Sequence, residues 1–324
     1  MSLRNFSRAS LFVLACAGSG LALSAAACGS EADDGAGGAG AASSSGTPAG
    51  SGGSGATGGG PGSGGTGGDG AANPGCEEPG DHPGAGPTLA VDSVEATLED
   101  TDGNPIADSQ VQLCGINLCL YGDTDGTGHV TVPGGAEMLE RPAFKYGDGT
   151  RHARFAVPVV EADTSLGTLV TVALPSEGVD LAIGTVVESG PVELDIAAGS
   201  GFVLDELTLD EPDELLFRAA SMDPTLLPAG VGVPEGMVTV YGVAPLETIF
   251  CPPAQVTVTN ETGLPADSAV EFWSHGVDVF ELAAPYAGWR KVSDGTVSAD
   301  GMTISTTAGQ GIEVLTTFGI KPAE

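Results

Sequence analysis

The chain has 324 residues, of which 43 are acidic, 10 are basic and 52 are glycine, and its formal net charge at pH 7 is −33. A surface this acidic repels phosphate backbones and anionic lipid headgroups, which excludes nucleic acid and anionic membrane surfaces as preferred partners. Solubility and self-repulsion explain such acidity, and cation binding or adhesion to a basic partner is the alternative.

Residues 1–27 have the features of an export signal. Arg4 and Arg8 form a short basic start, an apolar stretch covers residues 11–23, and small residues continue to Cys28. The apolar stretch is too short and too often interrupted by glycine to span a bilayer permanently. The sequence therefore predicts an exported protein.

Small residues at 24–27, directly before Cys28, resemble the lipobox of bacterial lipoproteins. The resemblance implies that Cys28 is multiply acylated and becomes the first residue of the mature chain, since one acyl chain alone binds a membrane only marginally. Ala25 stands where that family usually has leucine, so ordinary cleavage and secretion of a soluble protein stay open, as does acylation of Cys16. The expected location is the cell envelope of a Gram-negative bacterium, lipid-anchored at the outer membrane or cell surface.

Residues 35–75 are dominated by glycine, with 19 glycines among 41 residues, and most of the others are Ala, Ser, Thr or Pro. Such a segment has no apolar surface to offset the entropy of ordering. We predict a disordered Gly/Ser/Ala linker over residues 28–76. As a flexible coil it would span about 35 Å on average, enough to hold a folded part away from the membrane.

About 250 residues follow the linker, enough for two domains. A first β domain is predicted over residues 77–177. Apolar residues at 94, 96 and 98 alternate with polar ones, and turn sequences occupy residues 102–105 and 123–128. Further strand-like runs cover residues 111–113, 118–121, 129–132, 143–146, 153–160 and 166–174. Short strands at this spacing favour a Greek-key sandwich.

The sequences GNPIA at 103–107, VQL at 111–113 and TDGTGHV at 124–130 resemble the transthyretin-like carboxypeptidase regulatory domain family. The resemblance covers about 85 residues. It implies a seven-stranded β-sandwich without catalytic residues of its own, a module found appended to enzymes, receptors and surface proteins. Residues 114–119 depart from the pattern of that family.

Residues 178–324 predict a second β-sandwich. Strand-like runs cover residues 237–241, 255–259, 270–273 and 302–305, and turn sequences separate them. These runs and turns loosely resemble sandwich domains repeated in bacterial cell-surface proteins. The predicted fold class is all-β, with two Ig-like or transthyretin-like sandwiches after a disordered linker.

Four cysteines remain besides Cys16 and Cys28, and an exported protein reaches a compartment where disulfides persist. Cys114 and Cys119 enclose four residues and are expected to form a disulfide. Cys76 and Cys251 are then left to join each other, stay free or pair between chains. Cysteine and histidine pairs at zinc-ligand spacing are lacking.

The sequence Asp-Thr-Asp-Gly occurs at residues 100–103 and 123–126, and it raises the possibility of calcium binding. Asp123 and Asp125 follow the first ligand positions of an EF-hand loop, but Gly134 stands where that loop needs a bidentate glutamate. Turn residues at strand ends explain both copies without an ion. We therefore expect no cofactor or metal, with Asp123 and Asp125 as the only calcium candidates.

Enzyme motifs are lacking: the four histidines form no His-Glu-x-x-His sequence, and no nucleophile elbow is flanked by a strand-to-helix turn. Four aromatic residues in the second half, Phe272, Trp273, Tyr286 and Trp289, are expected in the core, with a sugar-binding platform as the alternative. The expected function is that of a non-catalytic, surface-tethered lipoprotein that presents its modules for binding or adhesion to a protein or polysaccharide. The alternatives are a structural or assembly lipoprotein of the envelope and a secreted hydrolase.

Overall fold

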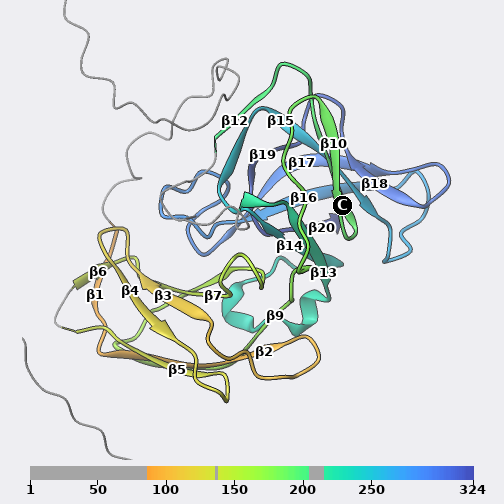
Figure 1. The fold of residues 1–324 in the computed structure, drawn as a ribbon. Coiled ribbons are helices and arrows are strands. Elements are labelled where there is room, and N and C mark those ends of the chain that lie inside the picture. The colour runs from red at the N-terminus through yellow and green to blue at the C-terminus, as the bar shows by residue number, and fades with distance from the viewer. Residues whose placement is uncertain (1–85, 136–137, 204–214) are drawn as a thin grey trace, which may run out of the picture. The chain divides into compact units, whose positions relative to one another are not determined.

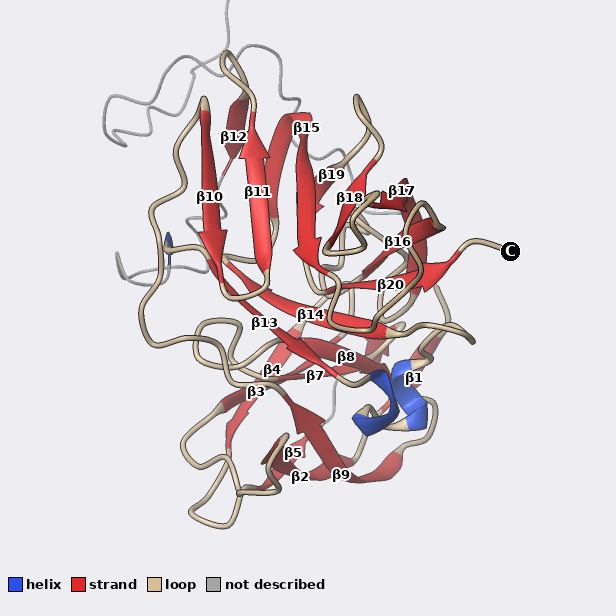
Figure 2. Cartoon of the chain, turned by 90° about the vertical axis from the view of Figure 1, so that its right-hand side faces the viewer, coloured by secondary structure: helices blue, strands red, loops and turns tan. Residues whose placement is uncertain are grey.

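A computed structural model describes residues 86–135, 138–203 and 215–324 (Figure 1). The predicted signal, Cys28 and the predicted linker lie outside these residues. Contacts between Cα atoms group all of the described residues into one unit. Apart from short 3₁₀ turns such as Pro224–Leu226 and Ala229–Val231, their regular structure is strand (Figure 2), so the all-β prediction is confirmed.

The first part of the fold, residues 88–174, contains three sheets. In the three-stranded sheet, β2 (Ser93–Asp100) runs antiparallel to β5 (His129–Pro133) and parallel to β9 (Asp163–Thr171). The four-stranded sheet has the order β4 (Cys119–Asp123), β3 (Gln110–Cys114), β7 (Ala143–Tyr146) and β8 (Phe155–Pro158). The short strands β1 (Thr88–Ala90) and β6 (Met138–Glu140) pair with each other.

Alternation along β2 explains how these sheets pack. Val94, Ala96 and Leu98 are buried while Glu95 is exposed, as expected for a strand with one face in a core. The buried face of this sheet shares one apolar cluster with the four-stranded sheet, including Phe144. Two sheets that bury their inner faces against each other give the first part a sandwich-like arrangement.

The second part, residues 178–322, is built on one eleven-stranded sheet. Its main path is β10 (Thr185–Ser189), β11 (Val192–Ile196), β15 (Thr248–Thr259), β18 (Thr303–Thr306), β17 (Trp289–Val297), β16 (Ala269–His275), β20 (Phe318–Pro322), β14 (Thr239–Ala244) and β13 (Arg218–Met222). Two further strands, β12 (Gly201–Val203) and β19 (Ile312–Leu315), pair with β15. The first and last strands of the path lie close together: the Ala219 N–H on β13 donates to Ser189 Oγ on β10 at 3.1 Å. The sheet is therefore nearly barrel-shaped.

Two apolar clusters extend across the predicted domain boundary at residues 177 and 178. Ala143 and Ala156 of the first part pack with the buried residues of the near-barrel. In the other direction, Met222, Leu227 and Val231 pack with the core of the first part. The division into two separate sandwich domains, 77–177 and 178–324, stays a prediction.

Candidate functional site

We call the contact between residues 88–174 and residues 178–322 the joint. Its polar contacts link side chains of the second part to the first: Thr317 Oγ1 donates to the Arg154 carbonyl at 2.8 Å, Tyr286 OH donates to the Cys114 carbonyl at 3.0 Å, and Arg141 forms an ion pair with Glu281. Thr317 and Tyr286 are buried, so the first two contacts give buried hydroxyl groups a partner, whereas the ion pair is partly exposed.

His275 lies at the centre of the joint and is fully buried. The Ala156 N–H donates to Nε2 at 3.0 Å, and Nδ1 lies 3.0 Å from the Gly288 carbonyl, to which it must donate. These partners fix the neutral tautomer with its hydrogen on Nδ1. The ring lies between Phe155 and Trp289, with centroid distances of 6.0 and 4.7 Å. Burial lowers the pKa of His275 to about 4, although the contact with Gly288 opposes this shift.

Half of the eight basic residues that follow Cys28 lie within residues 141–154. Lys145 is buried, and its Nζ lies 5.3 Å from the centre of the Tyr286 ring. Asp278, also buried, has a raised pKa because of burial, although an N–H from Leu282 and the charge of Lys145 oppose the shift. Three of the four basic residues of this segment, Arg141, Lys145 and Arg154, therefore lie at the joint.

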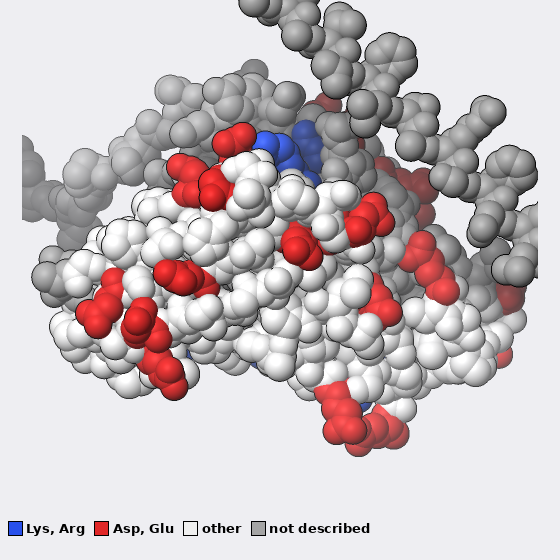
Figure 3. All heavy atoms as spheres, turned by 90° about the horizontal axis from the view of Figure 1, so that it is seen from below, with Lys and Arg blue, Asp and Glu red and all other residues white. Residues whose placement is uncertain are grey.

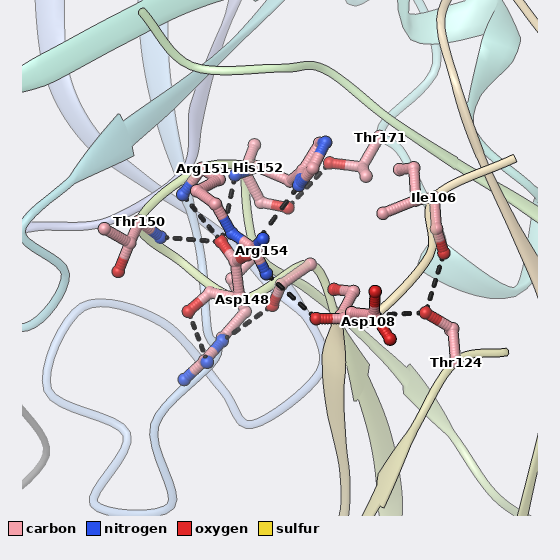
Figure 4. Close-up of polar contacts among 12 residues, drawn as sticks. Ile106, Asp108, Thr124, Asp148, Thr150, Arg151, His152, Arg154 and Thr171 are labelled. Carbon is pink, nitrogen blue, oxygen red and sulfur yellow. Dashed lines mark hydrogen bonds and ion pairs between the residues drawn. The ribbon is translucent and has the colours of Figure 1, made fainter. Parts of the chain in front are cut away.

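The turn between β7 and β8 is built around Asp148 (Figure 4). Asp148 Oδ1 accepts the N–H groups of Thr150, Arg151 and His152 at 3.0, 2.7 and 3.0 Å. Oδ2 accepts from Arg151 Nε at 2.8 Å, while His152 Nδ1 lies 3.8 Å away, beyond hydrogen-bond distance. Burial alone would raise the pKa of Asp148, but the contacts with His152 and with the backbone outweigh burial and hold the pKa well below its usual range. The hydrogen bonds of this carboxylate therefore stabilise its own turn.

The two Asp-Thr-Asp-Gly copies form turns of the same kind. Asp100 Oδ1 accepts the N–H groups of Asp102 and Asn104 at 2.9 and 2.8 Å. Asp125 Oδ1 accepts from the N–H and the hydroxyl of Thr127 at 2.8 and 2.7 Å. The remaining calcium candidate, Asp123, is exposed on β4. Within residues 86–135, 138–203 and 215–324, no three His, Cys, Asp or Glu residues are grouped as they would be to hold a metal.

The predicted disulfide between Cys114 and Cys119 is confirmed. The two residues are register partners at the tip of the β3–β4 hairpin. Cys251 is also disulfide-bonded, and its partner lies outside the described residues, as does the predicted lipidation site Cys28.

We expect that partner to be Cys76. If Cys28 is acylated and Cys16 is removed with the signal, Cys76 is the cysteine left for Cys251. Mass spectrometry of non-reduced peptides from the purified protein should recover a Cys76–Cys251 linkage beside the Cys114–Cys119 linkage. Free thiols at both positions, or a linkage between chains, would contradict this pairing.

Two hollows open on the surface of the described residues. The polar hollow, of about 360 Å³, lies between β16, β17 and the start of β19, and its polar lining residues are Ser274, Arg290, Lys291, Gln310 and Glu313. Its apolar floor includes Leu282, Val292 and Val314. The apolar hollow, of about 370 Å³, is lined mainly by β1, the end of β8 and residues 141–143 and 286–287.

The four aromatic residues considered for a sugar platform do not share one exposed face. Phe272 and Tyr286 are buried, so the core interpretation is confirmed for them. Trp273 and Trp289 are partly buried against the core of the first part. Their indole N–H groups donate to Glu271 Oε2 and to the Val231 carbonyl, each at 3.0 Å.

Acidic side chains are spread over the face seen in Figure 3, and basic ones are few there. In the first part, the exposed acidic residues include Asp92, Glu95, Asp102, Asp123, Asp125, Glu161 and Asp163. Such a surface favours solubility. A helix long and apolar enough to cross a membrane is not found in the part of the chain that the structure describes.

Neither protein-family models nor curated proteins match this chain. Sequence patterns did not identify Lys145, Asp148 or Asp278 as candidate functional residues. They showed His275 only as one of four scattered histidines. One signal was available: four basic residues crowd into 141–154 of an otherwise acidic chain, which indicates charge pairing within the fold.

Proposed function

We propose that the chain is a non-catalytic lipoprotein of the bacterial cell envelope, anchored through Cys28, whose β domains bind a protein or a polysaccharide. The order of export signal, cysteine, glycine-rich segment and β-rich remainder supports this proposal. The proposal includes two sandwich-type domains, the first of the transthyretin-like regulatory kind.

The non-catalytic part of the proposal is supported by the hydrogen bonds that the polar side chains form. The carboxylates of Asp100, Asp125 and Asp148 accept backbone N–H groups of their own turns. Both ring nitrogens of His275 are engaged with the backbone. These four side chains are thus engaged in structural hydrogen bonds and are not free for general acid–base chemistry.

The polar hollow is where we place the binding of a sugar ring. Lys291 is held by Glu271 and Asp294 at 2.9 and 2.7 Å, and Arg290 donates to the Leu282 carbonyl at 2.7 Å. Fixed side chains reduce the entropy that a ligand must overcome. Because Glu271 and Asp294 neutralise Lys291 and the carboxylate of Glu313 lines the same hollow as Arg290, the hollow suits a neutral polyhydroxylated ligand better than an anion. Its apolar floor would contact the C–H face of a sugar.

A glycan array tests this placement. The mature chain with Cys28→Ser, which stays soluble, is applied to neutral and acidic oligosaccharides. We expect retention on neutral glycans and at least a tenfold loss of affinity in Glu313→Ala, because Glu313 is exposed on β19 and lines the hollow. Glu188→Ala, an exposed glutamate on β10, is the matched control and should bind normally. Retention that is equal in both variants would exclude the hollow.

The anchoring part of the proposal predicts that the full-length protein partitions into detergent and incorporates fatty acid. Cys28→Ser should abolish both properties, because it removes the thiol that would carry the lipid. Phase separation in Triton X-114 and metabolic labelling with a fatty-acid analogue measure them. A Cys28→Ser protein that remains labelled and membrane-bound would move the lipid to Cys16.

The apolar hollow favours the second candidate, a structural or assembly lipoprotein with a protein partner. Val160 lines this hollow and is 79% exposed. Exposed apolar surface of this kind marks interaction sites. Crosslinking in intact envelopes would recover one stoichiometric protein partner under this alternative and several or none under the leading proposal.

A further inference from the structure

We propose that the joint is acid-sensitive: protonation of His275 removes the hydrogen bond from Ala156 and loosens the first part from the second, while each part keeps its own sheets. This property is independent of the ligand that the protein binds.

We call His275 a latch, because its hydrogen bonds hold the two parts together only while its ring is neutral. The N–H of Ala156, on β8, needs the lone pair of Nε2, and protonation replaces that lone pair with a second hydrogen. Two hydrogens would then face each other in a site that water does not reach, since both residues are fully buried. A buried donor without an acceptor is costly, and so is a buried charge.

The groups around the ring offer no anion to stabilise the protonated form. The charged residues on the segments around it include Lys145, which lies opposite Ala156 in the ladder, and Arg154, Asp278, Glu281 and Arg290. Arg154 donates to the carbonyls of Gly147 and Asp148, and Arg290 donates to that of Leu282. Glu281 is paired with Arg141, and the charge of Asp278 is balanced in part by that of Lys145. Burial governs the pKa of His275, and the contributions besides burial come from backbone contacts with Gly288 and Ala156.

The other ionisable contacts of the joint respond to a falling pH in two different ways. Burial alone would raise the pKa of Glu281, but the Tyr286 N–H and Arg141 outweigh it and lower the pKa, which favours the ion pair with Arg141 as the pH falls. The raised pKa of Asp278 means that this carboxylate loses its charge early, which weakens its attraction to Lys145. Two groups at one joint thus respond to mild acid in the same direction.

The sheets themselves lie apart from this latch. The described strands of residues 88–171 pair with one another, and those of residues 185–322 pair with one another, so no strand ladder crosses the joint. The other described histidines are His129, which is exposed, and His152, which lies in the Asp148 turn. Acid can therefore act on the joint before it acts on either sheet.

Hydrogen–deuterium exchange on the mature Cys28→Ser chain tests the inference. Protection factors, corrected for the intrinsic pH dependence of exchange, are compared between pH 7 and pH 4.5. We expect at least a tenfold loss in peptides that contain Ala156 or residues 286–290. Peptides from β2 and β18 should change less than twofold. Unchanged protection at the joint, or an equal loss in all four regions, would overturn the proposal.

Two variants sharpen the test. His275→Gln keeps an oxygen that can accept from Ala156 but does not titrate, so its joint should keep its protection at pH 4.5. His129→Gln is the matched control and should behave as the parent chain does. If His275→Gln does not fold, Trp273→Phe leaves Trp289 as the sole tryptophan, with its ring centroid 4.7 Å from that of His275. Its fluorescence should then change between pH 6 and 4, and a constant signal would contradict the latch.

Discussion

Phe318→Ala is expected to lower the free energy of unfolding by about 3–5 kcal/mol, the cost of removing a fully buried phenylalanine. Phe318 is 0% exposed, and its ring lies 5.0 Å from that of Tyr241 and 6.3 Å from that of Phe272. It lies on β20, between β16 and β14, so the cavity would open inside the near-barrel.

Urea denaturation followed by circular dichroism measures this loss. Met302→Ala is the matched control, because Met302 is 64% exposed and its truncation should change stability by less than about 0.5 kcal/mol. A Phe318→Ala protein as stable as the control would mean that the near-barrel core is not packed as described.

Asp148→Ala is expected to cost about 2–4 kcal/mol, because it strips three backbone N–H groups and Arg151 of their acceptor at a partly buried turn. Asp148→Asn should cost less, since its amide oxygen still accepts hydrogen bonds. Asp123→Ala removes an exposed aspartate and serves as the control.

The loss caused by Asp148→Ala should depend on pH. The folded pKa of Asp148 lies well below its ordinary value of 3.8, so its carboxylate stabilises the fold fully above that value. As the pH falls below about 4 the unfolded chain takes up the proton first, and this contribution is lost. The unfolding curves of the parent and Asp148→Ala should therefore converge toward pH 2. A difference that stays constant from pH 7 to pH 2 would contradict the role of the charge.

Local pattern was sufficient to predict much of the first part. The alternation at residues 94–98 became β2, and the run at 143–146 became β7 with the same bounds. Turns were predicted close to where Asp100 and Asp125 cap them, because an aspartate that caps its own turn needs only neighbours in sequence, although Asp123 still belongs to β4.

The second part was harder to predict because several of its strands lack clear alternation of apolar and polar residues in the sequence. β10 was not predicted, although it pairs with β11, and β17 was missed between β16 and β18. β17 carries Arg290 and Lys291 near its start, which obscures alternation that becomes clear only from Ser293 to Val297. Closure of the sheet through Ser189 and Ala219 joins residues 30 positions apart and leaves no periodic signal.

The joint could not be predicted for a related reason. The environment of His275 is formed by Ala156, 119 positions away, and by Gly288. A lone histidine in a strand-like run gives no indication of such partners. The acceptor for Tyr286, the Cys114 carbonyl, is 172 positions distant. The burial of His275 and its lowered pKa therefore depend on tertiary contacts that the sequence pattern does not reveal.

The parallel pairing of β2 and β9 determines how the first part resists a force applied between these two strands. Ser93 begins β2 and Thr171 ends β9, and the two strands are joined by seven residue pairs. Tension between Ser93 and Thr171 pulls the strands along their length in opposite directions. The ladder is then sheared, with its hydrogen bonds strained together, rather than unzipped one bond after another. A disulfide between Cys76 and Cys251 would carry tension from the N-terminal side directly to the second part, so the ladder would bear this load only when that disulfide is reduced.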